Sequence, residues 1–438
     1  MSESFEERIA AARALMAEDK ATEAFGELRW VFFDPELAGD RERFVEAITA
    51  LRPILASVVG EQTATVAEAV AQSPDDSQVL YGLGYALIEL GLPDVAACAL
   101  GRANSLTPGE EPIVTELVAA LERDGRNQEA CEVLRAEPQL CEQSFVCRYL
   151  LAFNSVLSAD LDGARALLPT LESRESEDEA YMASRVAAML QRADLLKETS
   201  DLGHQDLRGW HFVTTGGLLL HLSPYGFDDG MNGRYAYVSD TMELCKLGLT
   251  RLQALLEAWD EAPPWILAPP DRDSQILAAA AEEILGLPVV EYSADAGPGL
   301  IVVYDLNRLA QDTPAEILQH SPGQILYAHA TCWTDPPRCA PDVTTLLYQA
   351  LQTPWGERMK VDEDGEVETT AADERTEDDI AADIVAASDE NEELESFDPV
   401  DALLAVARAA GPGMAFREEE GRRSPLWEGG PVKSSKFV

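Results

Sequence analysis

Apolar residues in the first 195 positions recur every three or four residues, the spacing that places them on one side of a helix. We expect these helices in pairs: two over 5–35, an atypical pair over 40–72, further pairs from 77 onward and a last helix over 177–196. Pro108 should end a helix because it lacks a backbone N–H. The pattern therefore predicts an N-terminal half built of helical hairpins.

Small residues repeat within this half. Ala96, Ala130 and Ala164 are 34 residues apart, the period of stacked helical hairpins. Small side chains let paired helices approach, so we expect Gly84 and Ala96 to face each other. The spacing resembles the tetratricopeptide repeat (TPR) family, and the resemblance over 1–198 implies a protein-binding helical solenoid. Chance spacing in an alanine-rich chain is the alternative.

In that family, the first helix of each hairpin lines a concave groove. The resemblance implies a partner-binding groove at Gln78, Tyr81, Tyr85, Ile88, Tyr149 and Phe153. Because no basic residue occurs at these positions, an amphipathic helix of a protein partner is expected there, and an acidic peptide terminus is not. The aromatic residues could instead pack between helices.

From residue 201 the pattern changes to short β-branched and aromatic runs separated by glycines. We expect a hairpin of strands over 210–215 and 218–222, and then a helix over 240–260 capped by Asp240. Strands over 265–268, 288–292, 300–305 and 324–330 should alternate with helices over 274–285, capped by Asp273 or Ser274, and 313–318. A closing helix is expected over 343–351. Continuous apolar strands alternating with helices favour a parallel sheet in an α/β domain over 201–358.

The segment from Pro270 to Asp273, followed by a helix that should end at Gly286, is similar to the phosphoribosyltransferase family. In that family a later strand ends in two acidic residues, and a loop of small and hydroxyl residues holds phosphate and ribose. Here Asp305 ends the strand, but Leu, Asn and Arg follow it. The resemblance implies a Rossmann-like fold without that family's catalysis, and ligand-binding candidates at Arg272, Asp305 and Arg308.

A glycine-rich loop over 226–235 holds the remaining candidates for chemistry. Asp228 and Asp229 could act as acid and base or bind a metal, and Arg234 could hold an anion. A solvent-exposed turn is the alternative, because Asp and Gly also serve backbone geometry. We expect the loop to shape the mouth of a pocket without binding a structural metal.

The net charge of −46 limits the classes of partner that the protein can be expected to bind. Nucleic acid and anionic membranes should be repelled, because both need clustered lysine and arginine. The seven cysteines lack a metal-binding spacing, and neither a secretory signal nor a long apolar run occurs. We therefore expect a cytoplasmic protein with reduced thiols, no membrane span, no metal and no cofactor.

Acidic residues dominate 359–398, which we expect to be disordered. In the last part, 399–438, Asp398 should cap a short helix that starts at Pro399 and ends at Gly411. This helix could dock within the molecule, in the groove at Tyr81 and Tyr85, or on a partner. A purely solubilising acidic tail is the alternative.

The sequence as a whole predicts a helical repeat domain joined to an α/β domain. The expected function is that of an adaptor without catalysis, which binds a protein through the groove. The alternative is an enzyme acting on a nucleotide or phosphate-sugar ligand in the α/β domain, with the repeats directing it to its substrate.

Overall fold

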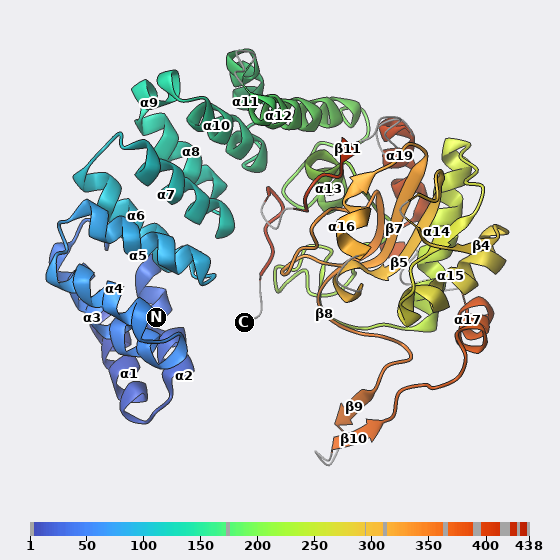
Figure 1. The fold of residues 1–438 in the computed structure, drawn as a ribbon, viewed down its shortest axis with the longest axis horizontal. Helices are drawn as coiled ribbons and strands as arrows, with labels where there is room; N and C mark the ends of the chain where they lie inside the picture. The colour runs from blue at the N-terminus through green and yellow to red at the C-terminus, as the bar shows by residue number, and fades with distance from the viewer. Residues whose placement is uncertain are drawn as a thin grey trace. The chain divides into compact units, whose positions relative to one another are not determined.

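A computed structural model describes residues 4–171, 176–293, 295–309, 313–361, 367–388, 396–411, 421–426 and 430–435. The chain divides into two compact units, Met1–Ala187 and Ala188–Val438 (Figure 1). The boundary lies within helix α12 (Glu177–Leu195), slightly before the position that the sequence suggested.

The first unit consists of helices joined by short turns, as the hydrophobic period predicts. The pairs are formed by α1 (Phe5–Ala17), α2 (Ala21–Arg29), α3 (Arg41–Val58), α4 (Glu61–Gln72), α5 (Ser77–Glu89), α6 (Pro93–Leu106), α7 (Glu111–Arg123), α8 (Asn127–Ala136), α10 (Phe145–Leu157) and α11 (Leu161–Leu167), with a short α9 (Pro138–Gln143) before α10. The expected helical N-terminal half is confirmed.

Glycine allows the closest approach within one of these pairs. A Cβ atom at Gly84 of α5 would lie 2.4 Å from Cγ of Leu100 on α6. Gly84 therefore packs under Leu100, whereas the sequence suggested Ala96 as its neighbour. Ala96 is itself fully buried. The hairpin is held by a large side chain filling the space that a glycine leaves.

The second unit is built on a parallel sheet, in agreement with the predicted fold class. Its strand order is β1-β8-β7-β5-β3-β4, and β2 also pairs with β8. The strands are β1 (Leu218–Leu219), β2 (Tyr235–Ser239), β3 (Ile266–Ala268), β4 (Val289–Glu291), β5 (Gly299–Asp305), β7 (Gln324–Cys332) and β8 (Val343–Gln352). Every pairing in this sheet is parallel.

The expected strand over 210–215 is wrong, because these residues belong to helix α13 (Leu207–Thr215). Asp206 caps it by accepting a hydrogen bond from the Gly209 N–H at 2.8 Å, and Gly216 ends it with a φ of 83°. All residues of α13 are buried. Its polar residues Arg208, His211 and Thr215 follow helical spacing, but the aromatic and β-branched residues among them favour a strand.

The expected closing helix over 343–351 is also wrong. These residues form β8, which pairs with β7 on one side and with β1 and β2 on the other. The first six residues of β8 are buried, so its apolar run does not alternate with polar residues. Such a run cannot be assigned to helix or strand from periodicity alone.

Two helices pack on the sheet, each starting near a predicted position. Helix α14 (Met242–Trp259) is capped by Thr241, whose hydroxyl accepts from the Leu244 N–H, and not by Asp240. Helix α15 (Arg272–Leu285) is capped by Asp271, and not by Asp273 or Ser274. The short helix α16 (Thr313–Ile317) follows β5 as expected.

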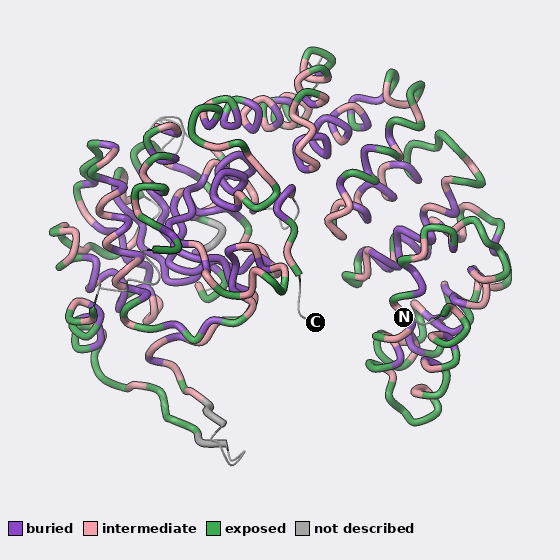
Figure 2. Tube along the Cα trace, turned by 180° about the vertical axis from the view of Figure 1, so that it is seen from behind, coloured by how far each residue is buried: buried purple, intermediate pink, exposed green. Residues whose placement is uncertain are grey.

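The C-terminal part is folded where the structure describes it. Residues 359–398, expected to be disordered, include the strand pair β9 (Arg358–Val361) and β10 (Val367–Thr370) and the helix α17 (Glu377–Ala386). Ile380 and Ile384 of α17 are buried, and α17 packs against α15 and α14. The tube of this helix has both buried and exposed stretches (Figure 2). Acidic residues thus occupy its exposed side only.

The last helix, α19 (Val400–Ala410), belongs to the second unit. It packs on α14, where Trp259 donates its indole N–H to the Ala407 carbonyl at 2.8 Å and Leu403 is fully buried. Docking in the groove at Tyr81 and Tyr85 is therefore wrong. A short strand β11 (Gly421–Arg422) pairs with β6 (Gln319–His320). Among the described helices, none has the length and apolarity needed to cross a membrane.

Two glycines of α5 give a test of the hairpin packing. Gly84→Ala should lower the free energy of unfolding by about 1–3 kcal/mol, because the added methyl group overpacks against Leu100. Gly82→Ala should instead raise it by up to about 1 kcal/mol, since nothing lies within 4 Å of its Cβ position and alanine favours the helix. Urea unfolding measures both changes. Equal effects of the two substitutions would contradict the packing.

Candidate functional site

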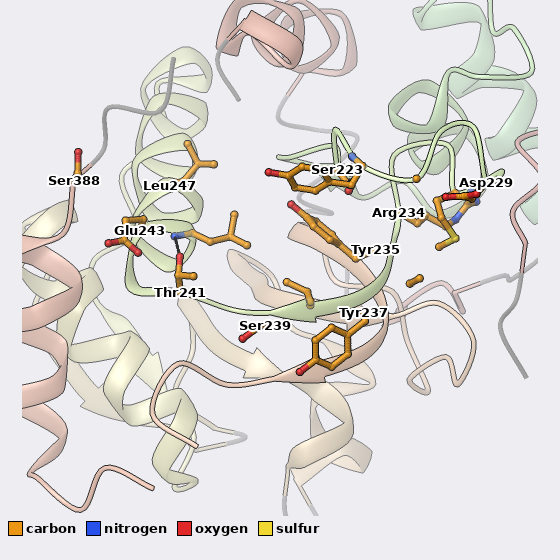
Figure 3. Close-up of a pocket in the computed structure, with 16 residues that line it drawn as sticks. Ser223, Asp229, Arg234, Tyr235, Tyr237, Ser239, Thr241, Glu243, Leu247 and Ser388 are labelled. Carbon is orange, nitrogen blue, oxygen red and sulfur yellow. Dashed lines mark hydrogen bonds between the residues drawn. The ribbon is translucent and has the colours of Figure 1, made fainter. Parts of the chain in front are cut away.

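A pocket of about 480 Å³ opens along β2 and the start of α14. Its wall also includes the loop from Ser223 to Arg234 and, from the far end of the chain, Ser388. Tyr235 points from β2 toward Ser223, while Thr241, Glu243 and Leu247 lie on the α14 side (Figure 3). The pocket thus lies between a hydroxyl-rich end and a helix N-terminus.

Arg234 is the side chain of this pocket that needs most explanation. It is 8% exposed, and its guanidinium lies 5.3 Å from the ring centre of Trp333. Among the described residues it forms no side-chain hydrogen bond or ion pair, and its Nη1 is buried without a partner. Burial lowers its pKa to about 10, so the group is still charged at neutral pH. A buried charge without a counter-ion is costly and rare.

The two carboxylates of the same loop are placed differently. Asp228 and Asp229 are exposed, and Asp229 lines the pocket at its edge. Gly226, Gly230 and Gly233 have positive φ values, which turn the chain back toward β2. The loop therefore sends Arg234 inward and its acidic residues outward. Paired carboxylates for acid and base chemistry are not brought together inside the pocket.

Two buried side chains, His221 and Asp398, hold the hydroxyl of Tyr235 in place. The hydroxyl lies 2.9 Å from Nε2 of His221, whose Nδ1 lies 3.5 Å from a carboxylate oxygen of Asp398. Burial raises the pKa of Tyr235 and lowers that of His221, so both rings are neutral at pH 7. With Nδ1 facing the carboxylate, Nε2 is the accepting nitrogen, so the phenol donates its proton to His221 and is held in one position at the pocket wall.

Asp398 is the centre of a buried ion-pair group. It accepts hydrogen bonds from Arg208 at 2.8 Å, from Arg251 at 2.6 Å and from the Leu222 N–H at 3.0 Å. Burial would raise the pKa of Asp398, but His221, the two arginines and this N–H outweigh it and hold the pKa well below its usual range. The role predicted for Asp398, capping the last helix, is wrong, because the cap of α19 is Pro399.

The ligand candidates from the phosphoribosyltransferase resemblance lie at the carboxyl ends of β3 and β5. In parallel sheets a ligand crevice forms where the chain switches direction, here between these two strands. Arg308 forms an ion pair with Asp273 at 2.9 Å and lies 3.7 Å from Asp305. Asp305 also accepts a hydrogen bond from the Tyr348 hydroxyl. These charges satisfy one another.

Arg272 does not join them. Its guanidinium donates to the carbonyls of Asp373 and Arg375 at 2.8 and 2.9 Å, and so holds the segment before α17. The structure thus brings Asp305 and Arg308 together but uses Arg272 elsewhere. Among the described residues, the set close enough to hold a metal ion is Asp240, Cys245 and His329.

The groove residues expected in the helical unit divide into two groups. Gln78 and Tyr85 are exposed and Tyr81 is half-buried. Ile88, Tyr149 and Phe153 are buried, so the expectation that they contact a partner is wrong. Arg185 of α12 covers the last two: it lies 4.2 Å from the Phe153 ring centre and donates to the Tyr149 hydroxyl.

Substitution of Asp398 tests whether its ion pairs stabilise the interior behind the pocket. Asp398→Asn should lower the free energy of unfolding by about 3–5 kcal/mol, because it leaves two buried arginines without their shared charge. Asp401→Asn, an exposed change three residues later at the start of α19, should have little effect. Thermal unfolding followed by circular dichroism measures both. A loss below about 1 kcal/mol for Asp398→Asn would contradict this role.

Comparison of the chain with protein-family models and with curated proteins finds no match in either set. Inferences about function therefore start from the geometry of the chain itself.

Proposed function

We propose that this protein is a binding scaffold without catalysis, in which the α/β unit holds a small anionic ligand and the helical unit holds a protein partner. The observation that carries the proposal is Arg234, a buried guanidinium that has no counter-ion among the described residues of a chain of net charge −46. Carboxylates are abundant in this protein, yet none of the described ones forms an ion pair with Arg234. An anion from outside would supply the missing charge.

The chemistry around Arg234 indicates the kind of anion. A guanidinium presents planar pairs of N–H donors that match phosphate and carboxylate oxygens. The hydroxyl oxygen of Tyr235, which lines the same pocket, adds a neutral polar group beside the guanidinium. Tyr225 and Tyr237, each 60% exposed, offer apolar ring surface for the remainder of the ligand. A phosphorylated or carboxylated metabolite of pocket size fits this set.

For the helical unit, the exposed side of α5 and α7 supports a basic amphipathic partner. Tyr85 is 50% exposed, and Tyr81 lies beside it within reach of Glu116. Burial raises the pKa of Glu116, and the neighbouring Glu89 adds to this rise. Burial likewise raises the pKa of Glu122 to about 7. Cations from a partner would stabilise these carboxylates, and the tyrosines would pack on its apolar side.

An enzyme acting on a phosphate-sugar ligand is the second candidate. The specific observation in its favour is that Tyr235 is backed by His221 and Asp398 in the pocket that holds Arg234. A positioned phenol with a histidine behind it can transfer a proton to or from a bound ligand. The two candidates share the ligand site and differ in whether the ligand is changed.

Arg234→Met is expected to have two opposite effects. The ligand-free protein should be as stable as the original or more so, because an unpaired buried charge is removed while the packing on Trp333 is kept. Binding of a pentose phosphate, measured by calorimetry, should weaken about tenfold or more. Arg338→Met, an exposed change, is the control and should leave binding unchanged.

Two results would contradict the anion site. The first is that the original protein binds none of three probes: the pentose phosphate, inorganic phosphate and a dicarboxylate. The second is that Arg234→Met binds them as tightly as the original protein does. Incubating the pentose phosphate with the protein and following it by ³¹P NMR separates the two candidates. An unchanged spectrum supports the scaffold, whereas a product that Tyr235→Phe abolishes supports the enzyme.

The partner face is tested with a synthetic helical peptide that carries leucines on one side and lysines on the other. Tyr85→Ala should weaken its binding about tenfold, as expected for loss of an aromatic anchor. Glu89→Gln with Glu116→Gln should weaken binding at low salt, where charges are least screened. The control, Glu132→Gln with Glu142→Gln, removes the same charge from exposed positions on α8 and α9. Equal losses in both pairs, measured by fluorescence anisotropy, would indicate attraction to net charge only.

A further inference from the structure

Three potential metal ligands meet beneath the first turns of α14. Asp240 follows β2, Cys245 lies in α14 and His329 lies near the end of β7. All three side chains are fully buried. Carboxylate, thiol and imidazole together form a donor set that suits zinc. The fold thus gathers these groups in the interior of the sheet's carboxyl end, away from water.

The separations of the three ligand atoms match those around a tetrahedral ion. Asp240 Oδ2 lies 3.0 Å from His329 Nε2 and 3.4 Å from Cys245 Sγ, and the sulfur lies 3.8 Å from the same nitrogen. Usual zinc–ligand distances at tetrahedral angles place oxygen and nitrogen about 3.3 Å apart, and sulfur about 3.5 Å from either. Each observed separation is within about 0.3 Å of these values.

The cluster does not have the geometry of a catalytic Cys–His–Asp triad. In a triad, the nucleophile and the carboxylate hold opposite nitrogens of the histidine ring. Here both Cys245 and Asp240 lie against Nε2, while Nδ1 has no hydrogen-bond partner among the described residues. Convergence of sulfur, oxygen and nitrogen on one point is what coordination of a single ion requires.

The surroundings hold each ligand in place. Tyr304 donates its hydroxyl to Asp240 Oδ2 at 2.6 Å, and its ring lies against the His329 ring with centroids 5.3 Å apart. A Cβ at Gly248 would lie within 3.0 Å of His329 Nδ1 and close to the hydroxyls of Tyr327 and Thr345. Outer groups of this kind orient metal ligands, and Tyr304 also supplies a further oxygen donor beside the three.

We propose that Asp240, Cys245 and His329 form a zinc site that joins the start of α14 to strands β2 and β7. Binding replaces the thiol proton of Cys245 with the metal, and the proton passes to solvent. The ion has a structural role, because its ligands are closed off from the pocket by burial. This site does not depend on the anion site at Arg234.

Cobalt is the probe for the test, because a tetrahedral cobalt–thiolate site absorbs both in the visible and in the near ultraviolet. The full-length protein is stripped with a chelator and titrated with Co²⁺. We expect one equivalent to bind with strong visible bands and a sulfur-to-cobalt charge-transfer band, and Zn²⁺ to displace it. Cys245→Ser should abolish the charge-transfer band, whereas Cys332→Ser, a buried cysteine on β7, should leave it intact.

A measurement on the original protein covers the case in which Cys245→Ser does not fold. X-ray absorption of the zinc-loaded protein should show one sulfur and about three nitrogen or oxygen ligands. Absence of stoichiometric zinc or cobalt binding would overturn the proposal. So would a charge-transfer band that persists in Cys245→Ser, or a zinc shell with two or more sulfurs, which would place the metal at other cysteines.

Discussion

The buried carboxylate of Asp398 is the contact on which the α/β unit depends. It neutralises Arg208 from α13 and Arg251 from α14, and it also accepts the N–H of Leu222. It supplies a counter-charge to both buried arginines, and removing one partner of a buried ion pair costs about 3–5 kcal/mol. Its position fixes α19 on α14, and it stands behind His221 and Tyr235 at the pocket. Residues from the end of the chain therefore complete the interior on which the pocket rests.

The position of the proposed ligand pocket follows from which charged residues around the sheet are already paired with one another. At the strand switch between β3 and β5, where parallel folds usually bind ligands, Arg308 is paired with Asp273 and lies near Asp305. Among the residues described at that crevice, these charges are paired with one another. At the β2 edge, Arg234 has no such partner among the described residues. The charges at the strand switch are thus paired within the protein, whereas the charge of Arg234 at the β2 edge has no described partner.

The helical unit obeys a different constraint. Its hairpins combine complementary sizes, as where Leu100 fills the space above Gly84, with ion pairs such as that of Arg29 with the buried Asp94. Near the end of the unit, α12 covers aromatic side chains of α10 through Arg185, which lies over Phe153. Tyr85 on α5 has no such cover and is half exposed. The free face that we propose for a partner is consequently the part of the repeats that their own stacking does not bury.

The sequence by itself determined the elements that have one solvent-exposed side and one buried side. The hairpins of the first unit and helices α14 and α15 were predictable because apolar and polar residues alternate with a helical period. It also pointed to Arg234, through the glycines around it. It could not place α13, whose aromatic and β-branched residues favour a strand, or β8, whose first six residues form a buried run without alternation. Nor could it reveal that no described residue pairs with Arg234, that Asp398 contacts Arg208 across 190 residues of chain, or that His329 meets Asp240. Those features are set by contacts between distant segments, and only the packing of the folded chain brings such segments together.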